Sequence, residues 1–139
     1  MTAEEIRKSL SSKGLKVTPQ RVNILNAIYE LGNHPTAEKI IEHIRVDNPN
    51  IAKGTVYNVL DSLIEKRLIR RVKTENDISR YDGITDRHHH LYCTECDLIE
   101  DYYDPELDAV LDNYFKKKKF KGFHMEDVVL QIRGTFDKC

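Results

Sequence analysis

Residues 53–73 read KGTVYNVLDSLIEKRLIRRVK, a segment with helical periodicity that passes into a β-forming run. Its apolar residues recur at helical spacing and predict one buried stripe, formed by Val56, Val59, Leu60 and Leu63. The run at 68–73, a polar turn at 74–77 and a second run at 78–82 predict a short hairpin. The segment therefore indicates a helix followed directly by a hairpin.

Shorter helical segments precede this one. A first helix is predicted over residues 3–13. Thr18 and Pro19 provide a cap and a first-turn proline for a second helix, and Thr36 provides the cap of a third. Three or four short helices followed by a hairpin are typical of a winged helix-turn-helix domain, which we expect over residues 1–83.

If this domain binds DNA, its last helix enters the major groove, where small polar side chains reach the edges of the bases. The candidate base-reading residues are Thr55, Tyr57 and Asn58, and the candidate phosphate-neutralising residues are Lys16, Arg21, Arg70 and Arg71. The alternative is a plain helical bundle whose polar face is only solvated, because helix-turn-helix patterns of this kind are common.

The overall composition gives no sign of a nucleic-acid partner, since 22 Lys and Arg stand against 23 Asp and Glu in 139 residues. The charge is unevenly distributed, however. Residues 1–83 carry 14 basic and 11 acidic side chains, a balance of +3, whereas residues 84–139 carry 8 and 12, a balance of −4. This asymmetry indicates two separate tasks along the chain.

Three cysteines are too few for a secreted disulfide scaffold. No apolar run approaches the roughly 18 residues that a membrane span needs, and the first residues have no apolar signal core. We therefore expect a cytoplasmic protein with no membrane partner.

The second half contains the run HHHLYCTEC at residues 88–96. The spacing of Cys93 and Cys96 lets two thiolates bind one tetrahedral Zn²⁺, and Cys139 is the candidate for a third ligand. The alternative for the pair is two reduced, buried thiols.

The histidines of this run are a second candidate site. In a strand, His88 and His90 point to one face and His89 to the other. Two imidazoles combined with carboxylates suit Fe²⁺, Mn²⁺ or Zn²⁺. Asp82 precedes the run, and four acids follow it, among which the sequence does not choose: Asp97, Glu100, Asp101 and Asp104. The alternative is an exposed polar strand.

A helix over residues 104–119 and a strand over 127–133 complete the second half. Lys116–Lys119 would lie at the negative end of that helix, as the helix dipole favours, although a nucleic-acid patch is the alternative. This unit over 84–139 is short of core, so zinc and a dimer partner are plausible sources of stability. The predicted fold class is α+β, a winged helix followed by a small α/β dimerisation domain.

In order and spacing, five segments together resemble the ferric uptake regulator (Fur) family of bacterial metal-dependent repressors. They are VTPQR at 17–21, GNHPTA at 32–37, GTVYNVL at 54–60, RYD at 80–82 and HHHLYCTEC at 88–96. The resemblance implies a homodimer that binds a double-stranded DNA operator through its N-terminal winged helices and dimerises through its C-terminal domain.

The resemblance also implies a ligand set. In the peroxide-sensing (PerR) branch, the motif positions that hold the regulatory metal fall here on His34, Asp82, His88, His90 and Asp101. The iron-sensing branch typically has glutamate where this chain has Asp82 and Asp101, so the chain is similar to the peroxide sensors. Fe²⁺ or Mn²⁺ would act as corepressor, and His34 and His88 would be the residues that peroxide oxidises.

One departure from the family concerns zinc. Many members have a second Cys pair near the C-terminus, but Phe136 occupies the first of those positions here. The site formed by Cys93, Cys96 and Cys139 is then one ligand short, so that water or another side chain completes it or zinc is absent. Zn²⁺ could also occupy the regulatory site. A further metal site near His89 or His124 is a weaker expectation, because residue 128 is Val rather than His.

Two alternative functions stay open at this point. The first is a sensor of iron or zinc availability without redox chemistry. The second, more remote, is a non-haem iron oxygenase, since two histidines and a carboxylate also describe such enzymes.

Overall fold

The structure, a computed structural model, describes residues 1–74, 78–83 and 87–139. The chain divides into two compact units, Met1–Thr85 and Asp86–Cys139. Most of the predicted turn at 74–77, and the residues that follow the predicted domain boundary after residue 83, lie outside the described part of the chain. The mixed helix-and-sheet fold class is confirmed.

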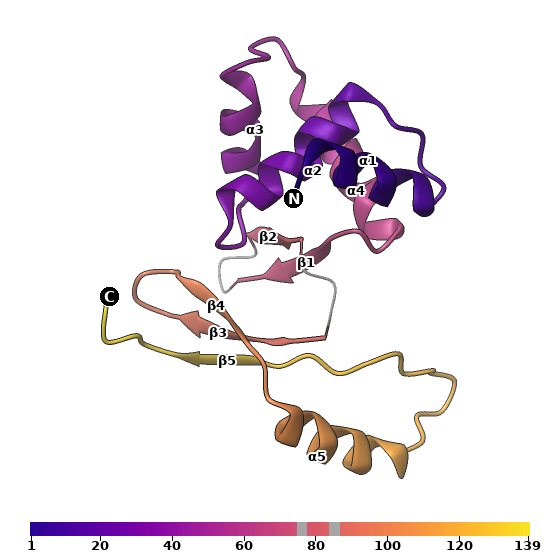
Figure 1. The fold of residues 1–139 in the computed structure, drawn as a ribbon. Helices are drawn as coiled ribbons and strands as arrows, with labels where there is room; N and C mark the ends of the chain where they lie inside the picture. The colour runs from indigo at the N-terminus through magenta and orange to yellow at the C-terminus, as the bar shows by residue number, and fades with distance from the viewer. Residues whose placement is uncertain (75–77, 84–86) are drawn as a thin grey trace. The chain divides into compact units, whose positions relative to one another are not determined.

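The first unit begins with four helices: α1 (Ala3–Ser12), α2 (Pro19–Leu31), α3 (Ala37–Arg45) and α4 (Lys53–Glu65) (Figure 1). Each of the first three starts after a threonine whose hydroxyl accepts a backbone N–H three residues on, namely Thr2, Thr18 and Thr36. Helix α4 follows Ala52 and has no side-chain cap. No helix in the described part of the chain is long and apolar enough to cross a membrane.

The apolar stripes of these helices form one core. Its fully buried members come from all four helices and include Ile6, Leu10, Ile24, Leu25, Ile40, Val56, Leu60 and Leu63. Burying one such side chain contributes about 1.5–3 kcal/mol, so the spacing of apolar residues accounts for the packing of the helices. The predicted stripe on α4 is confirmed, with Val59 partly buried at its margin.

A two-stranded hairpin follows α4. Strand β1 (Arg70–Lys73) pairs antiparallel with β2 (Ser79–Asp82), with Arg70 opposite Asp82. Strand β2 also contacts the segment that enters α3, because Tyr81 N donates to the Pro35 carbonyl at 2.9 Å. The chain after α2 is thereby attached to the end of the hairpin.

The loop between α2 and α3 has an unusual backbone. Gly32, Asn33 and His34 have φ values of 59°, 47° and 53°, a left-handed conformation that is uncommon for non-glycine residues. Arg80, which is 4% exposed, donates from Nε to the His34 carbonyl at 2.8 Å and from Nη2 to the Asn33 carbonyl at 3.4 Å. The guanidinium therefore stabilises this loop by satisfying its carbonyl groups.

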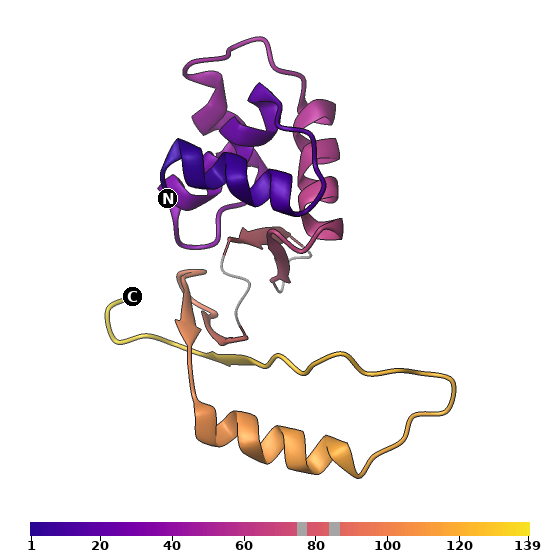
Figure 2. The ribbon, with the colours of Figure 1, turned by 45° about the vertical axis from the view of Figure 1, so that its right-hand side comes forward.

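The second unit contains a three-stranded sheet of order β4-β3-β5 and one helix (Figures 1 and 2). Strand β3 (His89–Cys93) pairs antiparallel with β4 (Ile99–Tyr102) and parallel with β5 (Gln131–Gly134). Helix α5 (Pro105–Lys116) starts at Asp104, whose side chain accepts from Leu107 N at 3.0 Å.

Two predicted bounds in this unit are too wide. The strand expected over 127–133 spans Gln131–Gly134, because its ladder with β3 begins at Gln131, opposite His90. The helix expected to reach residue 119 ends at Lys116, so the helix dipole accounts for Lys116 but not for the lysines after Lys117, the C-cap.

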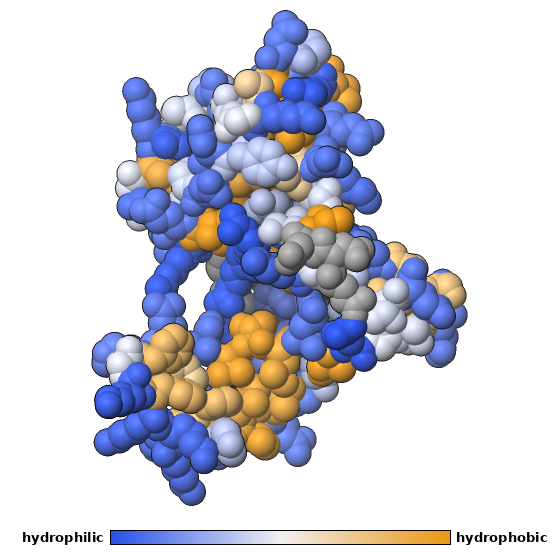
Figure 3. Space-filling view, turned by 180° about the vertical axis from the view of Figure 1, so that it is seen from behind, coloured by the Kyte–Doolittle hydropathy of each residue, from blue (hydrophilic) through white to orange (hydrophobic). Residues whose placement is uncertain are grey.

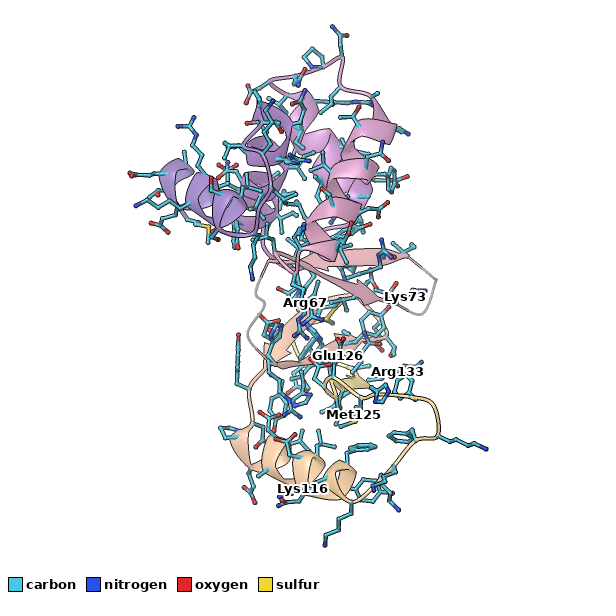
Figure 4. The ribbon with its side chains drawn as sticks, turned by 90° about the vertical axis from the view of Figure 1, so that its right-hand side faces the viewer. Arg67, Lys73, Lys116, Met125, Glu126 and Arg133 are labelled. Atoms are coloured by element: carbon cyan, nitrogen blue, oxygen red, sulfur yellow. A yellow bond between two sulfur atoms is a disulfide. The ribbon has the colours of Figure 1, made fainter. Side chains whose placement is uncertain are left out.

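Much of the second unit's apolar surface is uncovered within one chain. Helix α5 has no buried residue, and every residue of β5 is exposed. Figure 3 shows an apolar area on this unit, and its large exposed apolar side chains include Val110, Tyr114, Phe120, Phe123, Met125, Val129 and Ile132. Figure 4 locates Lys116 on α5 and Met125 on the extended segment that leads to β5.

The role of Arg80 is tested by Arg80→Met, which keeps much of the side-chain volume but removes every donor. The buried carbonyls of the loop then lose their partners, so we expect the free energy of unfolding of the metal-free protein to fall by about 1–3 kcal/mol. Urea denaturation measures this change. Arg7→Met, on an exposed position of α1, is the control and should change it by less than about 0.5 kcal/mol. Equal effects of the two variants would contradict the assigned role.

Candidate metal centre

The first unit brings one histidine and one carboxylate together. His34 lies in the left-handed loop after α2, and Asp82 is the last residue of β2. His34 Nε2 lies 3.4 Å from Asp82 Oδ2, and the two side chains are 6% and 4% exposed. Because Arg80 on the same strand as Asp82 holds the backbone of His34, the hairpin and the loop position this pair jointly.

Helix α2 fixes the chain just after Asp82. Tyr29 Oη donates to the Gly83 carbonyl at 3.1 Å. A Cβ at position 83 would lie 2.9 Å from Cε1 of the Tyr29 ring, so glycine allows this close approach. Burial, and secondarily the negative charge of Asp82, raise the pKa of Tyr29, which keeps the phenol protonated as a donor.

The second unit brings two histidines and one carboxylate together. His88 Nε2 and His90 Nε2 lie 3.2 and 3.8 Å from Asp101 Oδ1, and the two imidazole rings are 4.7 Å apart. Asp101 is the β4 residue directly opposite His90, which places both side chains on one face of the sheet. His88 and His90 are 1% and 5% exposed in their side chains.

His89 points to the opposite face, as the strand alternation predicts. Its Nδ1 accepts from Leu130 N at 2.9 Å, so the proton of the neutral ring lies on Nε2, which is 2.6 Å from Asp108 Oδ1. Both ring nitrogens are therefore used to join β3 to the start of β5 and to α5. This hydrogen bonding gives His89 a structural role.

The structure separates the four acids that the sequence left open. Asp97 accepts from Tyr92 Oη at 2.6 Å, Glu100 pairs with Lys138, and Asp104 caps α5. Asp101 is the one of the four that lies within ligand distance of the histidine pair in the described part of the chain. The sequence pattern could not select Asp101, because the choice depends on the register between β3 and β4.

The donor atoms of both groups fit a divalent cation of intermediate hardness. Imidazole nitrogens and carboxylate oxygens suit Fe²⁺, Mn²⁺ and Zn²⁺, and each group has one aspartate that offsets part of the charge of an ion. Burial of these polar side chains is costly unless a partner compensates it. Each unit by itself offers two or three protein ligands to an ion.

The cysteines form a separate cluster within the second unit. One sulfur from each of Cys93, Cys96 and Cys139 lies within 4.8 Å of the others. Cys96 and Cys139 form a disulfide with a Cα–Cα distance of 5.9 Å, and Cys93 Sγ lies 3.4 Å from Cys139 Sγ. The backbone N–H of Cys96 donates to Cys93 Sγ at 3.5 Å, and this hydrogen bond lowers the pKa of the Cys93 thiol.

The predicted DNA-contact residues lie on several elements of the first unit. Thr55, Tyr57 and Asn58 lie on α4, and Tyr57 is 44% exposed. Tyr57 and Arg71 line one surface hollow of about 500 Å³. Arg70 is half-buried on β1, whereas Lys16 is exposed and Arg21 half-buried at the start of α2.

Sequence reasoning missed three residues that position the first pair. Arg80, Tyr29 and Gly83 act through contacts between residues 46 or more positions apart. The motif RYD at 80–82 marked Arg80 as notable but gave no role for it.

Comparison with known proteins places this arrangement in a family. The sequence model of the ferric uptake regulator family matches residues 12–132. The peroxide operon regulator of Bacillus subtilis is 32% identical over 142 aligned residues, covering 100% of this chain and 96% of that protein. The peroxide-responsive repressor PerR of Staphylococcus saprophyticus is 35% identical over 107 residues, covering 77% and 72%.

Solved structures of two regulators also resemble the structure of this chain. The Helicobacter pylori ferric uptake regulator Fur, described as having three functional metal-binding sites, superposes with a TM-score of 0.79 at 26% identity, covering 100% of this chain and 94% of that one. The Campylobacter jejuni peroxide stress regulator gives a TM-score of 0.72 at 25% identity, covering 100% and 99%. The chain belongs to the ferric uptake regulator family.

Proposed function

We propose that this protein is a cytoplasmic, metal-dependent repressor that binds operator DNA as a homodimer and responds to peroxide through Fe²⁺ or Mn²⁺. The observation that carries the proposal is the pair of half-sites, His34 with Asp82 in the winged-helix unit and His88, His90 and Asp101 in the other. The oxygenase alternative is set aside, because the chain belongs to a family of regulators.

We infer that the two half-sites share one ion. Two protein ligands hold an ion weakly and three leave coordination positions open, whereas five nitrogen and oxygen ligands together suit Fe²⁺ or Mn²⁺. Such an ion would restrict the winged helix relative to the second unit, and hence the spacing of two recognition helices in a dimer. Coupling of this kind is typically worth about 1–3 kcal/mol.

Peroxide sensing is supported by the two aspartates and by relatives named peroxide regulators. Fe²⁺ bound at this site would promote the reaction with hydrogen peroxide, in which the imidazole ring loses two electrons and gains one peroxide oxygen while the other peroxide oxygen leaves as water. His34 and His88 are the proposed targets, because an oxygen atom added to either ring weakens that ligand. Loss of the ligand would release the winged helix from its DNA-binding arrangement.

Dimerisation is supported by the surface that one chain leaves uncovered. Strand β5 lies at an edge of its sheet with all of its residues exposed, and helix α5 has no buried residue, so both leave surface that a partner can cover. A second copy that packs there would bury both.

The cysteine cluster is proposed as an incomplete zinc site. Three sulfurs are available to a tetrahedral ion, and Phe136, whose ring lies 5.3 Å from Lys138 Nζ, offers no fourth ligand. We expect less than one zinc per chain after purification.

Removal of the metal tests the coupling. With a duplex selected from random sequence by the Mn²⁺-loaded protein, chelation of the metal or the substitution Asp82→Ala should weaken DNA binding by about 5- to 150-fold. Fluorescence anisotropy measures the affinity. His43→Ala, which alters an exposed histidine of α3 paired with Glu30, is the matched control and should leave it unchanged. Equal DNA affinity with and without metal would refute the proposal.

The peroxide response is tested by comparing two metals. After anaerobic loading with Fe²⁺ and addition of stoichiometric hydrogen peroxide, peptides that contain His34 or His88 should gain one oxygen mass, and DNA binding should be lost. Mn²⁺-loaded protein should show neither change, and the His43 peptide serves as an internal control. No mass gain with Fe²⁺ would instead support sensing of metal availability without redox chemistry.

Dimerisation is tested by placing a charge on the exposed face of α5. Val110, 59% exposed, contributes nothing to the core of one chain, so Val110→Asp should leave folding intact while weakening self-association by about tenfold or more, or about 1.4 kcal/mol. Sedimentation velocity measures the monomer–dimer equilibrium. Val46→Asp, at an 80% exposed position of the first unit, is the control. A monomeric parent protein, or equal dimerisation of both variants, would contradict the assignment.

A further inference from the structure

The segment that follows helix α5 concentrates positive charge in an otherwise acidic unit. Residues 84–139 contain eight basic side chains, and five of them are the lysines at positions 116–119 and 121, whereas the other three stand against twelve acids. All five lysines are exposed. In the described part of the chain they form no ion pair, although Arg87 and Lys138 of the same unit do. Their charge is therefore available to an external anion.

The same segment carries three phenylalanine rings that form two aromatic pairs. The ring centroids of Phe115 and Phe120 are 6.3 Å apart, and those of Phe120 and Phe123 are 5.9 Å apart. Phe123 N donates to the Phe120 carbonyl at 3.1 Å, and Gly122 between them has a φ of 70°, which glycine adopts without steric cost. This tight turn sets the spacing of the last two rings, and Phe120 stands between two lysines in the sequence.

The rings and the lysines share one hollow in the surface of the second unit. Its volume is about 430 Å³, and its lining includes Phe120, Phe123, Lys118 and Lys119. Phe120 and Phe123 are 45% and 63% exposed, so a ligand can reach much of each ring. Lys118 Nζ lies 5.1 Å from the centroid of the Tyr114 ring, at the distance of a cation–π contact. A ligand in this hollow would meet aromatic rings and positive charge together.

We propose that this basic turn, residues 116–123, binds single-stranded nucleic acid without sequence preference, with phosphates on its lysines and bases stacked on Phe120 and Phe123. Proteins that bind single strands combine a positively charged surface that follows the backbone with aromatic rings on which successive bases stack. Every base has a π face, so such binding tolerates any sequence. This goes beyond the proposed function, because it needs neither the winged helix nor the regulatory metal.

Three other occupants fit these observations less well. A DNA duplex offers phosphates, but its bases are stacked on one another and present no face to the rings. An anionic membrane also attracts lysines, but it is an extended surface that would meet the twelve acids of this unit as well. A second copy of this chain would bury the lysines, a residue type that is depleted in protein interfaces. A single strand has both phosphates and accessible bases.

The first test measures how the metal-free full-length protein binds a fluorescein-labelled oligothymidylate, by fluorescence anisotropy at several salt concentrations. Removal of the metal excludes the operator binding that the proposed function describes. The affinity should fall with salt, with a log–log slope of about −0.7 for each phosphate contact. One variant that combines Lys118→Gln, Lys119→Gln and Lys121→Gln should bind about tenfold more weakly or worse, with a slope shallower by about 2.

The matched control removes three charges from exposed positions of the first unit, at Lys8, Lys39 and Lys66. With all three changed to glutamine, the affinity and the salt slope should stay those of the parent protein. Circular dichroism should show the parent secondary structure in both triple variants. An equal loss of affinity in the two would mean that net charge rather than this segment attracts the strand, and would overturn the proposal.

A further substitution separates stacking from charge. Phe120→Leu keeps an apolar side chain but removes the aromatic face, so the affinity for oligothymidylate should fall by about 5- to 150-fold while the salt slope stays unchanged. Oligouridylate should bind within about tenfold of oligothymidylate, because both offer phosphates and base faces. An unchanged affinity of the Phe120 variant would show that the segment attracts any polyanion and would contradict the stacking role.

Two more probes decide between the occupants. A duplex of the same length and phosphatidylglycerol vesicles should each bind the metal-free protein more weakly than oligothymidylate, and tighter binding of either would overturn the proposal. Mn²⁺-loaded protein that binds its selected duplex but no single strand would also overturn it, and would leave the proposed function intact. Single-strand binding without metal-dependent duplex binding would support this proposal and contradict the proposed function.

Discussion

Burying an ionisable side chain costs free energy unless a partner compensates it, and this constraint governs both groups of candidate metal ligands, one in each unit. His34 and Asp82 are almost fully buried, and so are His88 and His90. Ordinary cores of this size are filled with residues such as the isoleucines of α2 and α3. Each buried histidine has a carboxylate beside it, because His34 pairs with Asp82 and both His88 and His90 pair with Asp101. The metal proposal rests on that placement.

The two units position their candidate ligand residues in different ways. In the sheet, the ladder between β3 and β4 sets Asp101 opposite His90, so regular secondary structure is sufficient. In the first unit, a strained loop carries His34, and a buried guanidinium is needed to hold it. The histidines and aspartates form donor groups of one kind, and the cysteines form a cluster of another. Nitrogen and oxygen donors suit Fe²⁺ or Mn²⁺, whereas sulfur donors suit Zn²⁺.

The sequence predicted most of the helices because their signals are local. Threonine caps, Pro19 and the apolar stripes lie within a few residues of what they specify. The strand expected over 127–133 is shorter because only pairing with β3 defines where β5 begins. Val128 and Val129 have β propensity without belonging to that ladder. Residues close in sequence specify a helix cap, but they do not specify which distant strand a segment pairs with.

The candidate site, like the fold, was predictable from the sequence only where its signals are local. Spacing alone set His88 and His90 on one face, and it identified the Cys pair. It could not choose Asp101 among four acids, because that choice depends on strand register. His34 came only from the resemblance to the family, since a loop histidine has no pattern of its own. The supporting role of Arg80 depends on contacts 46 residues apart and became apparent only from the structure.

The central claim is that one ion is shared by ligands from both units, and a Mn²⁺ titration followed by electron paramagnetic resonance tests it most directly. The account predicts one tightly bound Mn²⁺ per chain, and His34→Ala and His90→Ala should each abolish binding of that same ion. Two independent ions per chain, or a variant of either unit that retains the wild-type Mn²⁺ affinity, would contradict it.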